Sequence, residues 1–353
     1  MYRRRSSRRE AVVEARGGLD PRRLFKAYYS LSPPVEEPRD IGYREFAFQL
    51  FDGDVYVRHI GFDSMEELLS YMAREAPKNA YYSVARYSLP TARSMEEKGW
   101  LGSELMFDID VDSLEGCGEV LGDSCLSRGY KQAVRLVEAL YRDFGVPSTL
   151  YFTGNRGFHV LADCGWCRRL GREERREIAR YFTLEGLRIE LIIPRPGRKG
   201  VRPAPPSPED PGLRGWIARA ALERGVDLSA VHEAIEDLLD DVRVAIDVKV
   251  TQDITRLARI VGSLNGKAGL IVARLGLEGF HPGDWLSPFR GEVEFRASAR
   301  LEESRILGST VSLEPGRVYS MPAHIAVLLQ LKGYGAVAGG EIVVRAAAGW
   351  RPL

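Results

Sequence analysis

The sequence contains no hydrophobic run long enough to span a bilayer, although 44% of its 353 residues are hydrophobic. It also shows no signal peptide, and the acids Glu10 and Glu14 in its basic first segment argue against a transit peptide. These absences argue against a membrane-spanning or exported protein. They predict a soluble, intracellular protein of the cytoplasm.

Amide side chains and lysine are scarce as well. The chain has four Gln and three Asn, and its 50 basic residues comprise 42 Arg and only eight Lys. Few thermolabile amides among many charges are typical of a thermophile, although an Arg excess can also reflect a GC-rich genome. The net charge is only +1. A surface that binds nucleic acid must therefore be local and balanced by acids elsewhere.

Composition divides the chain into three parts, within a length that suits one large domain or two ordinary ones. Residues 1–20 are expected to be a basic arm, either binding nucleic acid or forming a disordered, solvated tail. Residues 21–170 and 241–353 are expected to form the core. Residues 171–240 include a Pro/Gly/Arg-rich stretch and are expected to be a helical excursion or subdomain.

Hydrophobic patterning predicts an α+β fold with local β-hairpins and no internal repeat. Strands are predicted over 44–51, 54–62, 79–88, 105–112, 148–154, 158–163 and 242–250. Helices are predicted over 64–76, 127–145, 171–188, 221–239, 251–262 and 321–332. From about residue 270 the chain mixes short strands with the last of these helices.

The run LMFDIDVD, residues 105–112, places acids inside an apolar segment. Read as a strand, it puts Leu105, Phe107 and Ile109 on one face, and Asp108 and Asp110 on the other, roughly 6–7 Å apart. Two carboxylates this close raise each other's pKa unless a cation lies between them. The run is therefore either an exposed acidic strand face or half of a divalent metal site.

A third carboxylate is offered by VRVAIDVKV, residues 242–250, which alternates like the first strand. Its polar face carries Asp247 between cations, so a surface salt bridge is the simpler interpretation. If the two strands are neighbours, Asp108, Asp110 and Asp247 converge as hard oxygen ligands for Mg²⁺ or Mn²⁺. Such sites often hold two ions for phosphoryl or nucleotidyl transfer. Asp253, just after Thr251, is a rival third ligand.

Two glycine-rich segments could face the metals. TGNRGFH, residues 153–159, joins two strands and offers Thr153, Arg156 and His159 to an anion. GSLNGKAG, residues 262–269, offers Ser263 and Lys267, but its spacing is not that of a Walker A motif. An ordinary polar hairpin would also explain the first segment. Together with three acids, the two segments suit the transfer of a nucleotide from a triphosphate.

At this point the chain resembles the catalytic small subunit of archaeal and eukaryotic DNA primases, most closely the archaeal members. Seven blocks carry the resemblance in order: YYSLSPP (28–34), REFAF (44–48), VYVRHIGF (55–62), YYSVARY (81–87), MEEKGWLGSELMFDIDVD (95–112), TGNRGFHV (153–160) and DVKVTQDITRLARIVGSLNGKAGL (247–270). The resemblance implies a mixed sheet core related to RNA-recognition-type (RRM-like) sheets, flanked by helices, with a smaller helical subdomain.

The resemblance also implies roles for individual residues. Asp108, Asp110 and Asp247 would be the catalytic carboxylates and would bind two Mg²⁺ or Mn²⁺ ions. The nucleotide-binding set would be Thr153, Arg156, His159, Ser263, Asn265, Lys267, Arg58, Glu45, Ser83 and Arg86. The protein would use NTPs or dNTPs and a single-stranded DNA template to synthesise short primers de novo. It would act as a heterodimer with a primase large subunit.

Two departures from the family pattern stand out. Asn265 replaces the usual His of the second loop, and Ala268 replaces a Thr. An Asn can still donate a hydrogen bond to a phosphate but carries no charge, so nucleotide affinity or pH dependence is expected to differ.

The second departure is the loss of a four-ligand zinc knuckle after the acid pair, of which only Cys117 and Cys125 remain. Two cysteines cannot close a tetrahedral zinc site. A Cys117–Cys125 disulfide is favoured over two free thiols because intracellular disulfides occur in hyperthermophiles. Zinc shared with Cys164 and Cys167 is the least favoured choice, and CGWC is only weakly typical of a redox motif.

Two other functions compete with de novo primer synthesis. The chain could be a primase-like polymerase that extends or repairs ends without starting chains. It could instead be a nucleic-acid-binding scaffold that has lost catalysis, although the intact carboxylates argue against this. The preferred metal and the choice between NTPs and dNTPs stay open.

Overall fold

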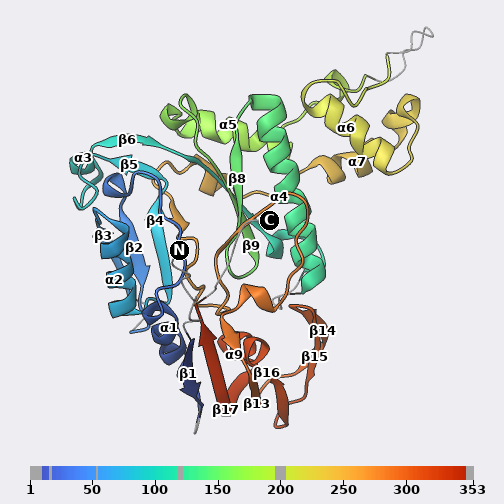
Figure 1. The fold of residues 1–353 in the computed structure, drawn as a ribbon. Helices are drawn as coiled ribbons and strands as arrows, with labels where there is room; N and C mark the ends of the chain where they lie inside the picture. The colour runs from blue at the N-terminus through green and yellow to red at the C-terminus, as the bar shows by residue number, and fades with distance from the viewer. Residues whose placement is uncertain (1–9, 16–17, 53–54, 118–121, 195–203, 347–353) are drawn as a thin grey trace, which may run out of the picture.

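The structure is a computed structural model that describes residues 10–15, 18–52, 55–117, 122–194 and 204–346. Helices and sheets are mixed along this part of the chain, as the α+β prediction required. Figure 1 shows two four-stranded sheets in the upper part, with a larger C-terminal sheet below them. No helix within the described ranges is long and apolar enough to cross a membrane.

The first sheet is antiparallel and lies beside two helices that pack on each other. Its strands, in spatial order, are β10 (Leu257–Arg259), β4 (Asn79–Ser83), β2 (Phe46–Gln49) and β3 (Tyr56–Ile60), and its helices are α1 (Pro21–Ser30) and α2 (Met65–Glu75). The predicted β2–β3 hairpin is confirmed, although its turn glycine, Gly53, lies outside the described residues. The predicted start of α2 is also confirmed, because the Ser64 hydroxyl accepts the amide of Glu67 (3.3 Å).

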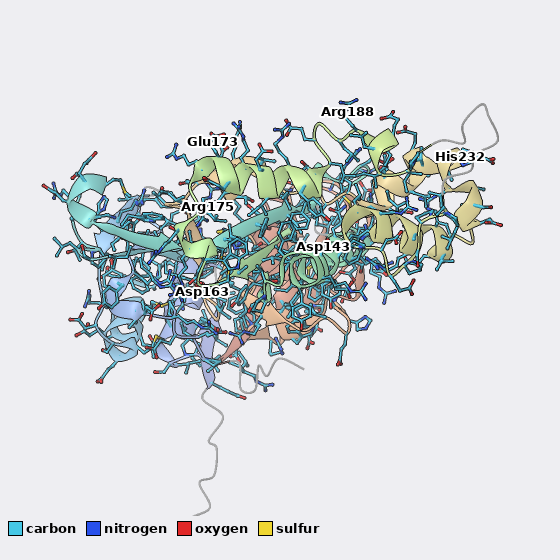
Figure 2. The ribbon with its side chains drawn as sticks, turned by 90° about the horizontal axis from the view of Figure 1, so that it is seen from above. Asp143, Asp163, Glu173, Arg175, Arg188 and His232 are labelled. Atoms are coloured by element: carbon cyan, nitrogen blue, oxygen red, sulfur yellow. A yellow bond between two sulfur atoms is a disulfide. The ribbon has the colours of Figure 1, made fainter. Side chains whose placement is uncertain are left out.

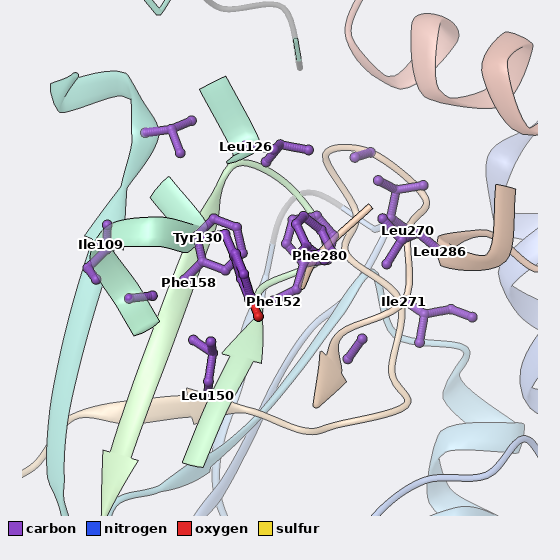
Figure 3. Packing of buried hydrophobic residues seen from close by; sticks show 14 of the residues in the cluster. Ile109, Leu126, Tyr130, Leu150, Phe152, Phe158, Leu270, Ile271, Phe280 and Leu286 are labelled. Atoms are coloured by element: carbon purple, nitrogen blue, oxygen red, sulfur yellow. The ribbon is translucent and has the colours of Figure 1, made fainter. Parts of the chain in front are cut away.

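The second sheet positions the candidate carboxylates. Its antiparallel order is β11 (Ala273–Leu275), β8 (Ser148–Phe152), β9 (Gly157–Ala162) and β7 (Leu105–Asp110). Figure 3 shows its apolar face, where Ile109, Phe152 and Phe158 pack toward Tyr130 of α4 (Asp123–Phe144). Because side chains alternate along a strand, Asp108 and Asp110 must lie on the opposite face.

The third sheet includes a strand from the expected N-terminal arm. It runs β1 (Glu10–Glu14), β17 (Gly335–Arg345), β13 (Glu292–Ala297) and β16 (Val318–Pro322), with β12 (Phe289–Arg290) on β17 and α9 (Ala323–Leu331) packed against it. β1 pairs with β17 in antiparallel register and buries Val13, so the disordered-tail prediction is wrong for residues 10–14. Residues 1–9 lie outside the described part of the chain.

Two small hairpins complete the sheets. They are β5–β6 (Ala85–Tyr87, Trp100–Ser103) and β14–β15 (Leu301–Ile306, Ser309–Leu313), and α3 (Met95–Lys98) precedes β6.

Two predicted elements around the third carboxylate are wrong. Residues 242–250 are not a strand, because α7 (Ile235–Val242) ends there and α8 (Val248–Gln252) begins after a short extended link. Asp247 caps α8 by accepting the amide of Lys249 (2.8 Å), a local bond that overrides the alternating pattern. Residues 251–262 are likewise not one helix, because β10 forms there on the edge of β4.

The segment expected to be helical contains α5 (Arg172–Thr183), α6 (Gly212–Glu223) and α7, with residues 195–203 outside the description. Figure 1 shows α6 and α7 extending away from the sheets beside α4, and in Figure 2 His232 lies at the far end of this extension. By contrast, α5 packs on α8 and is anchored by Arg175. The buried Arg175 guanidinium donates to the carbonyl oxygens of Ser103 (2.7 Å) and Glu104 (2.8 Å), just before β7.

All four cysteines are paired in disulfides. Cys117 bonds to Cys125, the favoured pairing, and Cys164 bonds to Cys167. The first bridge joins the segment that follows β7 to the first turn of α4. None of the thiols is left to hold zinc.

Replacing Cys117 and Cys125 together with Ser is expected to lower the free energy of unfolding by about 2–3 kcal/mol, because the bridge closes a short loop whose entropy the unfolded chain would regain. Thermal unfolding would measure the change. The paired Cys164→Ser, Cys167→Ser variant is the control, with a smaller loss expected because its loop is shorter. An equal melting temperature for wild type and the first variant would contradict the prediction.

Candidate active site

The two carboxylates of β7 lie on one open face of the second sheet. Asp108 is opposite His159 and Asp110 is opposite Gly157 in the β7–β9 register. Ile109, between them, is fully buried, whereas Asp110 is exposed and Asp108 is partly exposed. This arrangement is the one that the alternating sequence predicted.

Asp247 reaches this pair from the free edge of β7. Its backbone N–H donates to the carbonyl oxygen of Asp108 (3.0 Å), which places residue 247 directly beside the acid strand. Asp247 therefore lies next to Asp108, although it belongs to a helix cap rather than to a neighbouring strand. Asp253 is used locally, because its carboxylate accepts the amide (2.9 Å) and the hydroxyl (2.7 Å) of Thr255.

The charges of the three acids act on one another. Burial, together with the neighbouring carboxylates of Asp110 and Asp247, raises the pKa of Asp108 to about 6, against the lowering effect of Arg256 and Arg259. A cation placed among these oxygens would relieve the repulsion.

His159 lies across from Asp108 and is uncharged near neutral pH. Burial lowers the pKa of His159 to about 3, with Arg259 and Arg256 adding to the effect. Its Nε2 is 3.6 Å from Oδ1 of Asp108, so this contact is not an ion pair at working pH. A neutral imidazole can still donate one N–H bond to a phosphate oxygen.

The three carboxylates suit a divalent cation in donor chemistry. All donors are hard oxygens, which Mg²⁺ and Mn²⁺ prefer, and their mutual repulsion marks a place where positive charge is favoured. Within the described ranges, no three His, Cys, Asp or Glu side chains already form a group that could hold an ion as they stand. Metal binding by the three carboxylates would therefore require their side chains to rearrange.

The first glycine-rich segment is a tight turn packed against the second. Gly154 has a positive φ of 76°, and a Cβ there would come within 2.8 Å of the carbonyl oxygen of Leu270 and 2.9 Å of Cβ of Asn265. Thr153 Oγ1 donates to the carbonyl oxygen of Gly157 (3.0 Å). The two loops, distant in sequence, thus form one surface.

Asn265 joins these loops and does not point a free amide toward an anion. Its Nδ2 donates to the carbonyl oxygen of Thr153 (2.8 Å), and its Oδ1 accepts the amide of Lys267 (2.9 Å). The expectation that Asn265 donates to a phosphate is corrected accordingly. The buried hydroxyl of Ser263 is likewise bonded within the protein, because it donates to the carbonyl oxygen of Ile260 (2.6 Å). Lys267 is the exposed cation of this loop.

Glu45 and Ser83 are buried on the first sheet, where Glu45 also contacts the exposed Arg58. Glu45 accepts the Arg58 Nε (3.1 Å) and forms an ion pair with the buried Lys98, and its amide donates to Ser83 Oγ (3.0 Å). Burial alone would raise the pKa of Glu45, but Lys98 and Arg58 outweigh it and hold that pKa below its usual value. The sequence did not identify Lys98 as the counter-ion.

Arg86 does not join the nucleotide-facing residues. It is buried and its guanidinium pairs with Asp40 (2.6 Å), Asp163 (3.0 Å) and Glu104 (3.4 Å). Asp163 directly follows the last residue of β9, at the opposite end of that strand from Gly157. The expected role of Arg86 at the nucleotide is therefore replaced by a structural role.

Two arginines near the acids were not predicted as site residues. Arg256 and Arg259, in and beside β10, act electrostatically on both Asp108 and His159. The Arg259 guanidinium lies over the Tyr81 ring (5.0 Å) and donates to Asn79 Oδ1 (2.7 Å). Asn79 Oδ1 also accepts the amide of Gly266 (3.0 Å). Their position in a strand, rather than in the predicted helix, brings these cations to the site.

The surface combines adjacent carboxylates, an uncharged His and several cations. This combination is typical of one class of protein, the metal-dependent enzymes that act on phosphate groups. Comparison with known proteins identifies the family. The family model described as DNA primase small subunit matches residues 107–277.

Curated relatives match over nearly the whole chain. A DNA primase small subunit PriS of Aeropyrum pernix is 97% identical over 342 residues, covering 97% of this chain and 100% of the relative. Those of Sulfolobus acidocaldarius and Saccharolobus solfataricus are 37% and 38% identical, covering 89% of this chain and 94% of each relative. The solved polymerase domain from Mycobacterium tuberculosis Ligase D in complex with DNA is 13% identical with a TM-score of 0.39, covering 77% of this chain and 88% of that one.

The chain belongs to the DNA primase small subunit family. It is a nucleotidyltransferase that synthesises primers in DNA replication, and it is the small subunit of a heteromeric enzyme. The extending-polymerase and inactive-scaffold alternatives find no support. The family also implies dependence on a divalent metal ion.

Proposed function

We propose that Asp108, Asp110 and Asp247 are the catalytic carboxylates and hold two Mg²⁺ or Mn²⁺ ions. The assignment of Asp247 over Asp253 is supported by the bond from its backbone to Asp108, which is the single observation that carries the site. Zinc has no part in this proposal, because the four cysteines are paired with one another.

The phosphates of the incoming nucleotide are assigned to the surface formed by the two glycine-rich loops. Arg156, Lys267 and Arg259 supply positive charge, and the neutral His159 donates a hydrogen bond. Thr153 and Asn265 hold the loops in place through the bonds described above. Arg58, whose Nε donates to the Glu45 carboxylate, is assigned to the nucleotide as well, and the Ser83 hydroxyl in turn accepts the Glu45 amide.

In this reaction, the 3′-hydroxyl of the growing primer attacks the α-phosphate and pyrophosphate leaves. Divalent ions held by Asp108, Asp110 and Asp247 would lower the pKa of the attacking hydroxyl and offset the charge on the phosphates. The residues of this chain orient the triphosphate, and His159, which burial keeps uncharged near neutral pH, serves there as a hydrogen-bond donor. Positioning and charge stabilisation account for catalysis of this kind.

The assembly and fold assignments are part of the same proposal. A single-stranded DNA template lies beside the acids, NTPs or dNTPs are the substrates, and a primase large subunit completes a heterodimer. The β7–α4–β8–β9 unit carries the relation to RRM-like sheets, with β7 pairing with β9; the fourth strand, β11, pairs with β8.

An unprimed synthesis assay tests the assignment of the carboxylates. The purified full chain would be incubated with single-stranded DNA, labelled ATP or dATP, and Mn²⁺ or Mg²⁺, beside Asp110→Ala, Asp247→Ala and Asp253→Ala. Short products are expected from the wild type and from Asp253→Ala, and none from the other two. Products that survive in Asp247→Ala but not in Asp253→Ala would move the third carboxylate to Asp253.

A further inference from the structure

The segment immediately after the acid strand connects the carboxylates to Arg156. Asp110 ends β7 and its Oδ1 accepts the backbone N–H of Asp112 (3.1 Å). The Asp112 carboxylate forms an ion pair with the Arg156 guanidinium. A single residue thus contacts the acid pair through its backbone and the basic turn through its side chain.

The backbone reinforces this connection. The N–H of Val111 donates to the carbonyl oxygen of Arg156 (3.0 Å), so residues 111 and 112 are both bonded to residue 156. The Arg156 side chain is 19% exposed and that of Asp112 is 36% exposed. The pair therefore lies at the edge of the open face, partly withdrawn from solvent, where a fixed geometry costs less than it would for a fully exposed pair.

The far end of the segment is also held. Cys117 is bonded to Cys125, and the Arg128 Nη1 donates to the carbonyl oxygen of Glu115 (2.7 Å). Asp112 consequently sits in a short segment anchored by β7 on one side and by α4 on the other. Such anchoring gives its carboxylate a defined position relative to the Arg156 turn.

We propose that Asp112 is a positioning residue that holds the Arg156 guanidinium in place for the nucleotide phosphates. This inference rests on the proposed role of Arg156 in phosphate binding. A guanidinium has five N–H donors, so a carboxylate can hold one side of it while other donors face a phosphate. Asp112 touches neither substrate nor metal in this role and acts through Arg156. It preorganises a long side chain that would otherwise lose rotamer freedom when the nucleotide binds.

The test is a double-mutant cycle on extension of a primer annealed to a DNA template, with nucleotide concentration varied to separate KM from kcat. Asp112→Asn keeps the size of the side chain but removes its charge. Its KM for the nucleotide is expected to rise roughly three- to tenfold, which corresponds to the coupling energy of residues in direct contact. Its kcat is expected to stay within about twofold of the wild-type value. Arg156→Met is expected to raise KM further, and the double variant should match Arg156→Met alone.

Asp210→Asn is the matched control, because Asp210 forms a comparable ion pair with Arg214 (2.6 Å) in the helical segment. Its KM and kcat should equal those of the wild type. Thermal unfolding of Asp112→Asn close to that of the wild type would show that its effect is local.

Each other result has a distinct meaning. If Asp112→Asn leaves KM unchanged while Arg156→Met raises it, the positioning role is wrong and the phosphate role of Arg156 stands. If Asp112→Asn lowers KM, Asp112 competes with the phosphates, which overturns the proposal. Full additivity of the two substitutions also overturns it, because Asp112 would then act independently of Arg156. No effect of Arg156→Met would refute the proposed function at this residue and the inference with it.

Discussion

Asp108→Asn is expected to reduce primer synthesis by a factor of roughly 10³ or more, since it removes a ligand charge from a site where metal binding contributes several kcal/mol to the transition state. The substitution keeps the shape of the side chain and its place in β7. Initial rates of unprimed synthesis on single-stranded DNA at saturating nucleotide would measure the loss.

The same substitution should not weaken the fold. Burial and the two neighbouring carboxylates raise the pKa of Asp108, so its ionised form is unfavourable in the folded chain. Because its pKa is higher in the folded state than in the unfolded state, Asp108 costs stability as pH rises from about 4 through about 6, and that cost is fully present at neutral pH. In metal-free buffer at pH 7, Asp108→Asn is therefore expected to unfold at an equal or higher temperature.

The paired readouts distinguish a functional loss from a folding defect. A variant that loses activity and also unfolds well below the wild type would mean that Asp108 supports the fold and is not a strained ligand. A variant that retains substantial synthesis would remove Asp108 from the catalytic set. Asp253→Ala serves as the control, since the Asp253 carboxylate is bonded to Thr255.

The acid strand could be predicted because its signal is local. A period of two in LMFDIDVD determines which side chains face the core, and the observed burial of Ile109 and exposure of Asp110 follow from it. The same rule failed for residues 242–250. There four of the five alternating apolar residues are buried, but they belong to the end of one helix, a link and the start of another.

Contacts between distant segments could not be obtained from periodicity. Asp247 lies beside Asp108 through a backbone bond across more than a hundred residues, whereas the alternating pattern had pointed to Asp247 through a strand that does not form. The role of Asn265 was missed for the same reason, because its partner is a backbone carbonyl 112 residues away. A side chain whose chemistry suits a phosphate can instead form its hydrogen bonds with the protein backbone.

The second large effect is expected at Gly154, where the two glycine-rich loops are in contact. Gly154→Ala is expected to raise the nucleotide KM by roughly tenfold or more and to lower the free energy of unfolding by about 2 kcal/mol or more. The new Cβ would meet the carbonyl oxygen of Leu270 at 2.8 Å and the Cβ of Asn265 at 2.9 Å, in a backbone conformation with a φ of 76°. The loops must then separate, and the bond from Asn265 to Thr153 would lengthen or break.

Gly165→Ala is the matched control, because a Cβ at that position meets no atom within 4 Å. Asn265→Ala provides a second approach, since it removes the same bond without adding volume and leaves the buried carbonyl oxygen of Thr153 without its donor. Gly154→Ala and Asn265→Ala should each raise KM more than they lower kcat in primer extension. The reason is that the loops bind the phosphates, whereas Asp108 and Asp110 on β7 keep their positions. If Gly154→Ala and Asn265→Ala lost stability but kept the wild-type KM, the contact between the two loops would stabilise the fold without contributing to nucleotide binding. The phosphates would then have to bind elsewhere on the open face.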